Sequence, residues 1–138
     1  MPQNKDKNHD QKNMDSREKA LLIARLASEK QALDVLVLNM EGLTSFTEFF
    51  VICSGTSTTQ VRTIADYVAE TFKAKGARPL GVEGVSNARW VLIDFGDVVV
   101  HIFEEETRAF YELEKLWLDA PRLDVPIETQ TEKPETIE

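Results

Sequence analysis

In the first half of the chain, a segment whose apolar residues have helical spacing is followed by two continuous apolar runs. A helix is predicted from Asp15 onward, where Asp15 and Glu18 have the spacing of a capping box. Its apolar face is formed by residues three or four positions apart: Leu22, Ile23, Leu26 and Ala27. Residues 33–40 and 49–53 are nearly continuous apolar runs, which are typical of strands covered on both faces. Residues 42–45 are predicted to form the turn between them.

A second amphipathic helix is predicted after a short polar loop. Ser57 and Gln60 are placed as its capping box, and Gly76 is suited to end it in the left-handed conformation. Its apolar positions share one face: Val61, Ile64, Ala65, Val68 and Phe72. Residues 78–84 contain one proline and two glycines, so we expect an irregular edge strand or a loop there.

The third part of the chain predicts a hairpin and a last helix. Residues 90–95 and 98–103 form two apolar runs around Gly96-Asp97, a typical hairpin loop. Three glutamates, residues 104–106, are expected to open a helix, because carboxylates favour the positive end of the helix dipole. Its apolar stripe would consist of Ala109, Phe110, Leu113 and Trp117, and Pro121 would end it. The predicted fold is an α/β domain with a mixed sheet of about five strands.

Length and composition support one domain. The chain has 138 residues, of which 42% are apolar, and this suits a single core. We expect the domain at residues 15–121, a disordered N-terminal tail at 1–14 and a disordered acidic tail at 122–138. The single cysteine, Cys53, favours a reducing compartment. Neither a secretory signal nor a membrane-spanning stretch is evident, so a cytoplasmic location is predicted.

Alternation along the hairpin sorts its side chains into two unlike faces, provided that the loop has an even number of residues. One face is wholly apolar and should pack under the helices: Val91, Ile93, Phe95, Val98, Val100 and Ile102. The other face mixes aromatic, aliphatic and charged groups: Trp90, Leu92, Asp94, Val99, His101 and Phe103. A tryptophan within a mixed patch is typical of the anchor of a protein interface. The alternative is that a further helix covers this face and that His101 is an interior residue.

The charge of the chain bears on the kind of partner. Twenty-four acidic and 16 basic residues give a net charge of −8. Proteins that bind nucleic acid through its phosphates normally have the opposite balance. Between residues 94 and 114 there are seven carboxylates against one arginine, Arg108, which would attract a basic protein. The alternative is that these acids only keep the protein soluble.

Catalytic interpretations are weaker. Residues 54–57 (SGTS) could hold an anion before a helix, but they lack the lysine and spacing of a P-loop and favour a capped turn. Cys53 could act with His101 as its base, although a cysteine in such an apolar strand is usually a packing residue. Too few cysteines and histidines are present for a zinc site. Asp94 and Asp97 are the candidate carboxylates for two-metal nucleotidyl transfer, on opposite sides of the loop.

Five segments together resemble the ribosomal silencing factor (Iojap-like) family. They are ALDVLVLNMEGLTSFTEFFVICSGTS, QVRTIADYVAE, RPLGVEG, WVLIDFGDVVVHIF and EETRAFYELEKLWLDAPR, and they cover about residues 17–122 in unbroken order. The resemblance implies a fold similar to nucleotidyltransferases without their catalytic carboxylates. It therefore implies a protein that is no enzyme and needs no cofactor or metal.

The resemblance also implies a partner and a surface. The partner would be the large ribosomal subunit, bound through its fourteenth protein with little or no nucleic-acid contact, so that subunit joining is blocked and translation is repressed. Homodimers are implied as well. The matching residues of the recognition surface are Trp90, Asp94, Gly96, Asp97, His101, Arg108, Tyr111 and Glu114. Two alternatives stay open: an assembly factor of the large subunit that uses the same interface, and a magnesium-dependent nucleotidyltransferase.

Overall fold

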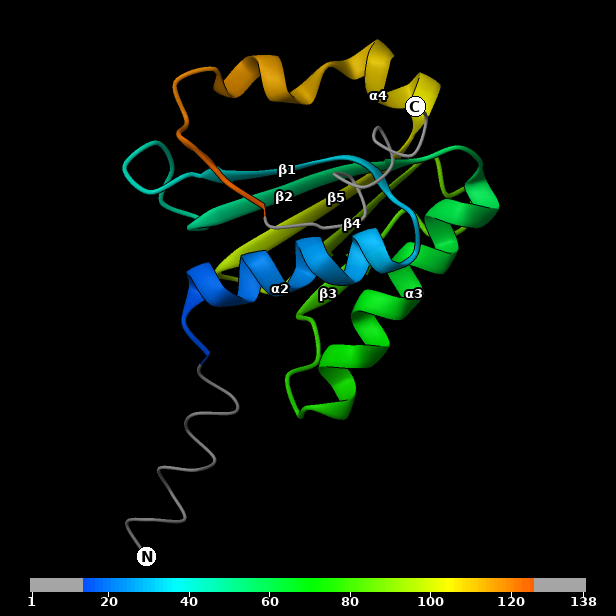
Figure 1. Ribbon diagram of the computed structural model, residues 1–138, viewed down its shortest axis with the longest axis horizontal. Helices are drawn as coiled ribbons and strands as arrows, with labels where there is room; N and C mark the ends of the chain where they lie inside the picture. The colour runs from blue at the N-terminus through cyan, green and yellow to red at the C-terminus, as the bar shows by residue number, and fades with distance from the viewer. Residues whose placement is uncertain (1–13, 126–138) are drawn as a thin grey trace, which may run out of the picture.

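The computed structural model describes residues 14–125 as three layers, with a twisted sheet between two helices on one side and a short helical segment on the other (Figure 1). The elements follow in this order: α2 (Ser16–Glu29), β1 (Leu33–Asn39), β2 (Phe49–Gly55), α3 (Thr58–Ala74), β3 (Gly81–Glu83), β4 (Trp90–Asp94), β5 (Val98–Glu104), α4 (Glu105–Tyr111), the 3₁₀ helix η1 (Leu113–Trp117) and β6 (Arg122–Leu123). No helix in this described part is long and apolar enough to cross a membrane.

The sheet is mixed and has six strands in the order β3-β4-β5-β2-β1-β6. β2 and β5 are parallel, while the other neighbouring strands are antiparallel. The mixed α/β class is confirmed, with one strand more than the approximate number predicted. The additional strand is β6, which pairs with β1 and takes two residues of the predicted C-terminal tail into the sheet. Residues 1–13 and 126–138, which make up most of the two predicted tails, lie outside the described residues.

The first core lies between one face of the sheet and the helices α2 and α3. The predicted apolar face of each helix points into this core, and the apolar residues of the α3 face are all buried or almost fully buried. All six apolar hairpin residues on the predicted inner face belong to the same core: Val91, Ile93, Phe95, Val98, Val100 and Ile102. The hairpin loop has an even length, because Phe95 N–H donates to Val98 O and only two residues lie between them. The predicted sorting of the hairpin is therefore confirmed.

A second core lies on the opposite face of the sheet. Its buried members include Leu38, Met40, Phe50, Ile52 and Phe103, and η1 contributes Leu113 and Trp117 as partly buried residues. The ribbon from α4 to β6 passes over this face (Figure 1). The sheet is thus covered on both sides along β1, β2 and β5, which explains why β2 is buried at every position.

Two local predictions were wrong. The last helix does not continue to Pro121: α4 ends at Tyr111, Glu112 adopts a left-handed conformation with φ of 49°, and η1 follows. Phe110 therefore points outward with 78% of its surface exposed, instead of joining an apolar stripe. At the start of α2, Asp15 occupies the N-cap position, but its side chain accepts no capping hydrogen bond. Ser57 does cap α3, by accepting from Gln60 N–H.

Candidate interaction surface

Trp90 is placed by the loop that precedes it. Gly84 has φ of +86°, and a Cβ atom there would lie 2.2 Å from the carbonyl oxygen of Trp90, so only glycine fits. The guanidinium of Arg62, on α3, donates to the carbonyl oxygens of Val85 and Ser86 at 3.2 Å and 2.7 Å. A tight turn and an arginine contact thus hold the start of β4 in position.

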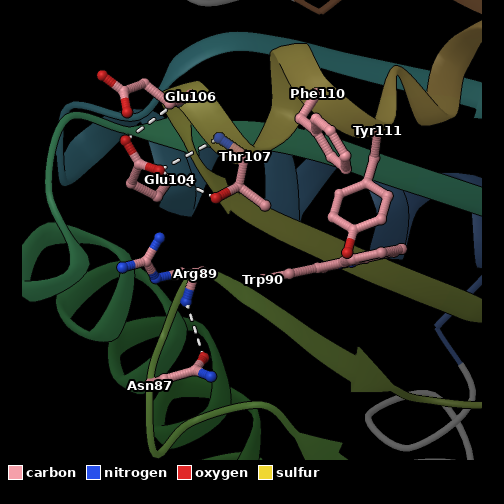
Figure 2. A pocket seen from close by; sticks show the side chains of 8 residues that line it. All are labelled: Asn87, Arg89, Trp90, Glu104, Glu106, Thr107, Phe110 and Tyr111. Atoms are coloured by element: carbon pink, nitrogen blue, oxygen red, sulfur yellow. Dashed lines mark hydrogen bonds between the residues drawn. The ribbon is translucent and has the colours of Figure 1, made fainter.

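The indole of Trp90 lies at the margin of the second core and is partly exposed. Its Nε1–H donates to Nδ1 of His101 at 3.1 Å. Its ring centroid is 4.7 Å from that of Phe103 and 5.0 Å from that of Tyr111. Figure 2 shows the Tyr111 ring standing over the indole, with Phe110 beside it. Trp90 therefore has one edge in the fold and another open to a partner.

His101 lies in the interior and not on the surface. Only 5% of the residue is exposed, and burial lowers the pKa of its imidazole from 6.5 to about 4. Since Nδ1 accepts from Trp90, the proton of the neutral ring must be on Nε2. That Nε2 is buried and has no hydrogen-bond partner among the described residues. The sequence left open that the mixed face of the hairpin is covered and that His101 is an interior residue. This is correct for the β5 residues of that face, Val99, His101 and Phe103, which are all buried.

The hairpin loop divides the predicted surface residues between two sides of the sheet. Asp94 is partly exposed, and its Oδ1 accepts from Gly96 N–H at 2.8 Å. Gly96 has φ of 91°, which the turn requires. Asp97 instead turns toward α2, where it accepts from Ser16 Oγ at 2.9 Å and pairs with Lys19 Nζ at 3.0 Å. Asp97 therefore lies on the α2 side of the loop, and its part in the recognition surface stays a prediction.

Arg108 and Glu114 hold α4 and η1 on the sheet. Arg108 Nε pairs with Glu114 Oε2 at 3.1 Å, and Nη1 donates to Asp34 O and Ser54 Oγ, both at 2.9 Å. Asp34 lies at a bulge of β1, with φ of 48° and a shift in register. Because the Arg108 side chain is only 11% exposed, its main contribution is structural. We name the segment 105–120, which these contacts fasten over the second core, the strap.

A hollow opens beside Trp90, between the start of β4, the end of β5 and α4. Its volume is about 430 Å³. We call it the aromatic hollow, and its lining residues are Asn87, Arg89, Trp90, Glu104, Glu106, Thr107, Phe110 and Tyr111 (Figure 2). Of these lining residues, only Trp90 and Tyr111 belong to the recognition surface predicted from the sequence. The left-handed break at Glu112, which turns Phe110 outward, had no signal in the sequence because non-glycine residues rarely adopt that conformation.

The structure does not bring the candidate nucleophile and base together. Cys53 lies in the first core and His101 faces the second, on opposite sides of the sheet. Burial also raises the pKa of the Cys53 thiol to about 12, so the reactive thiolate is disfavoured. Ser54 and Gly55 end β2, where Ser54 is bound by Arg108, and Ser57 caps α3, so residues 54–57 connect the strand to a capped helix.

The carboxylates needed for two-metal chemistry are also separated. Asp94 accepts from its own loop, while Asp97 is paired with Lys19 on the α2 side. Within residues 14–125, no group of three or more histidine, cysteine or acidic residues has the geometry to hold a metal ion. The described residues thus offer an aromatic surface with acids near it, and they do not bring together Cys53 with His101 or Asp94 with Asp97.

Comparison with known proteins finds relatives over most of the chain. The family model described as "Ribosomal silencing factor during starvation" matches residues 13–138. A ribosomal silencing factor of Halalkalibacterium halodurans is 43% identical over 112 residues, which cover 81% of this chain and 96% of that protein. A crystal structure of a Chromobacterium violaceum protein has a TM-score of 0.74 and 30% identity, covering 83% of this chain and 94% of that one.

A more distant relative carries a different name. The mouse protein "Mitochondrial assembly of ribosomal large subunit protein 1" is 34% identical over 99 residues, which cover 70% of this chain and 43% of that protein. The family match extends over more than half of the chain, and the bacterial relative is matched over nearly its whole length. The chain therefore belongs to the family of ribosomal silencing factors.

Proposed function

We propose that this protein binds the large ribosomal subunit through its fourteenth protein and blocks the joining of the small subunit. The observation that carries the proposal is the partly exposed Trp90, which contacts His101, Phe103 and Tyr111 and lies near the outward-facing Phe110. Partly exposed aromatic residues in a fixed geometry are typical anchors of protein interfaces. Family membership supplies the ribosome as the kind of target.

The proposed mechanism is steric and needs no covalent step. The sheet and strap present Trp90 as an apolar anchor, and the surrounding carboxylates favour a basic protein partner. Once bound, the domain occupies a surface that the small subunit needs, so intact ribosomes do not form. The separation of Asp94 from Asp97, and of Cys53 from His101, supports the non-enzymatic proposal.

The test is a subunit-joining assay with purified ribosomal subunits. Wild-type protein should lower the fraction of intact ribosomes as its concentration rises. Trp90→Ala should weaken binding by about 30-fold, since a buried aromatic anchor contributes about 2 kcal/mol or more. Tyr67→Ala is the matched control, because Tyr67 is a half-exposed aromatic residue on α3, on the other side of the sheet. Undiminished binding by a folded Trp90→Ala variant would exclude this surface.

A role in large-subunit assembly is the second candidate, and the name of the mouse relative favours it. Both functions use the same contact, so they differ in the particle that is bound. Pull-down of tagged protein from growing cells separates them: silencing predicts mature large subunits, and assembly predicts precursor particles with immature ribosomal RNA.

A homodimer is implied by the resemblance, a cytoplasmic location is predicted from the sequence, and nucleotidyl transfer is the enzymatic alternative. Homodimer formation is tested by sedimentation equilibrium of the purified full chain, where a single monomer mass would contradict it. A cytoplasmic location is tested by fractionating cells. Nucleotidyl transfer is tested by incubation with labelled nucleoside triphosphates and magnesium, and turnover that Asp97→Asn abolishes would replace the proposed function with an enzymatic one.

A further inference from the structure

The aromatic hollow has the size and the walls of a receptor for a long side chain. Its volume of about 430 Å³ lies within the range of pockets that bind small organic groups. Trp90, Phe110 and Tyr111 form the apolar walls, and they come from β4 and α4. Phe110 is 78% exposed and Tyr111 53% exposed, so both rings are accessible from outside the fold.

The polar rim is unevenly charged. The Glu104 carboxylate caps its own helix by accepting from the backbone N–H groups of Glu106 and Thr107 and from Thr107 Oγ1. Those hydrogen bonds, foremost the one from the Glu106 backbone, lower the pKa of Glu104 and keep it ionised, and the nearby charge of Arg89 acts in the same direction. The Glu104 carboxylate is therefore ionised and engaged in capping its own helix.

Glu106 differs from Glu104 in its contacts. It is exposed and lines the hollow, and none of the ion pairs among residues 14–125 includes its carboxylate. Figure 2 shows Glu106 on the α4 side of the hollow, apart from Arg89 on the strand side. In Figure 2 its carboxylate points away from the Trp90 and Tyr111 rings, but the side chain is exposed and can turn toward a cation whose stem lies against the aromatic walls.

We propose that the aromatic hollow receives one lysine or arginine side chain of the protein partner, with Glu106 as its counter-ion. This inference rests on the proposed function for the identity of that partner. Long basic side chains have apolar stems that cover aromatic surface, and their charged heads are attracted by tryptophan and tyrosine rings. Charge complementarity selects this occupant over an acidic or a neutral one.

An unstacked RNA base is the competing occupant, since bases also stack on aromatic side chains. It fits the hollow less well, because Glu104, Glu105 and Glu106 would repel the phosphates that accompany a base. Arg89 is the one basic residue among the described residues that line the hollow, and it would attract them. The two occupants predict opposite responses to a reversal of charge at Glu106. Replacement by lysine repels a basic side chain, and it attracts a phosphate backbone.

The first experiment needs no ribosome. Isotope-labelled full-length protein is titrated with N-acetyl-arginine methylamide and, separately, with N-acetyl-glutamate methylamide, while the NMR signals of the Trp90 indole and the Thr107 amide are followed. The arginine probe should shift both signals in a saturable manner, and Glu106→Lys should remove most of this response. The absence of a shift in wild-type protein, or equal shifts with both probes, would overturn the proposal.

The second experiment measures binding to purified large subunits. Glu106→Lys should weaken binding by about tenfold, which corresponds to about 1.4 kcal/mol. Glu105→Lys is the matched control, since Glu105 is exposed in the same helical turn and does not line the hollow. It should change binding by less than about twofold, in keeping with the small effects of exposed charges.

The outcomes of the two experiments separate the inference from the proposed function. Stronger binding of Glu106→Lys would identify RNA as the occupant and overturn the proposal, and unchanged binding would also overturn it. If wild-type protein does not bind large subunits at all, the proposed function fails, and the NMR titration by itself decides whether the hollow accepts a cation. Glu106→Gln, which removes the charge without reversing it, should fall between wild type and Glu106→Lys.

Discussion

At the scale of single residues, the sheet assigns different roles to neighbours that look alike in the sequence. Asp94 and Asp97 lie on the same loop, yet one stays on the side of Trp90 and the other pairs with Lys19. The side chain of Lys19 is only 10% exposed and also lies 5.4 Å from the Phe95 ring centroid. A nearly buried ammonium group needs its counter-ion, because an unpaired charge away from water is costly.

Asp97→Asn should therefore reduce stability without affecting recognition. We expect the free energy of unfolding to fall by about 2 kcal/mol, since Lys19 loses its counter-ion. Urea denaturation measures this change, and Lys19→Met combined with Asp97→Asn should recover part of it. Binding of folded Asp97→Asn to large subunits should equal that of wild type. A selective loss of binding at unchanged stability would return Asp97 to the interaction surface.

His101 should make the fold sensitive to acid. The pKa of a histidine open to water, as in the unfolded chain, is 6.5, whereas burial lowers it to about 4 in the folded protein. Between pH 4 and pH 6.5 the unfolded chain therefore binds more protons than the folded protein. The contribution of the neutral His101 to the free energy of unfolding is therefore fully present above pH 6.5. It falls by about 3 kcal/mol as the pH is lowered to 4.

Urea denaturation between pH 7 and pH 4 tests this prediction. His101→Gln should show a smaller loss of stability on acidification than wild type, because glutamine does not titrate. His9→Gln removes the chain's other histidine and should keep the wild-type slope. Equal slopes for His101→Gln and wild type would show that His101 already accepts a proton in the fold.

At the scale of elements, the strap decides how much of the second sheet face is available. Its anchor is Arg108, which contacts β1, β2 and η1 at once. The strap also encloses polar atoms without partners among the described residues: His101 Nε2, Glu114 Oε1 and Trp117 Nε1. Such atoms lower the stability of the segment, because each loses its hydrogen bonds to water. The strap should thus be the first part of the described fold to open.

Arg108→Ala should release the strap. Hydrogen exchange of the backbone amides of residues 113–120 should accelerate, and the free energy of unfolding should fall by about 2 to 3 kcal/mol because Glu114 loses its buried partner. Lys115→Ala is the matched control: its pair with Glu112 is exposed on both sides and contributes at most about 1 kcal/mol. Equal exchange rates in the two variants would show that apolar packing alone holds the strap.

At the scale of the whole molecule, the net charge of −8 should govern the approach to a basic partner. Attraction between unlike charges accelerates association, and salt screens it over a distance of about 10 Å at 0.1 M. Dissociation depends more on the short-range contacts of Trp90.

Raising the potassium chloride concentration should therefore lower the association rate with large subunits and change the dissociation rate much less. Rapid-mixing fluorescence at fixed magnesium concentration measures both rates. Trp90→Ala should show the reverse pattern, with faster dissociation and a nearly unchanged association rate. An association rate that rises with salt would indicate that like charges meet at the interface.

Local pattern was enough to predict most elements and the two faces of the hairpin. The apolar residues recur regularly along α3 and alternate with other residues along β4 and β5. Only one register of each strand buries all of its inward-facing apolar side chains, because a shift by one residue would turn them outward. The same reasoning could not predict that Asp97 faces α2 or that α4 stops at Tyr111. Both depend on contacts with residues far away in the chain, Lys19 in the first case and Asp34 and Ser54 in the second.

What the amino-acid order determined by itself is the α/β class, the apolar side of each element and Trp90 as a candidate anchor, since periodicity and side-chain type are local properties. Only the tertiary structure decided which side chains remain open beside that anchor. The strap covers His101 and leaves Phe110, Tyr111 and Glu106 at the surface. The physical reason is that exposure is a property of three-dimensional packing: a side chain is open or closed according to which distant segment lies against it.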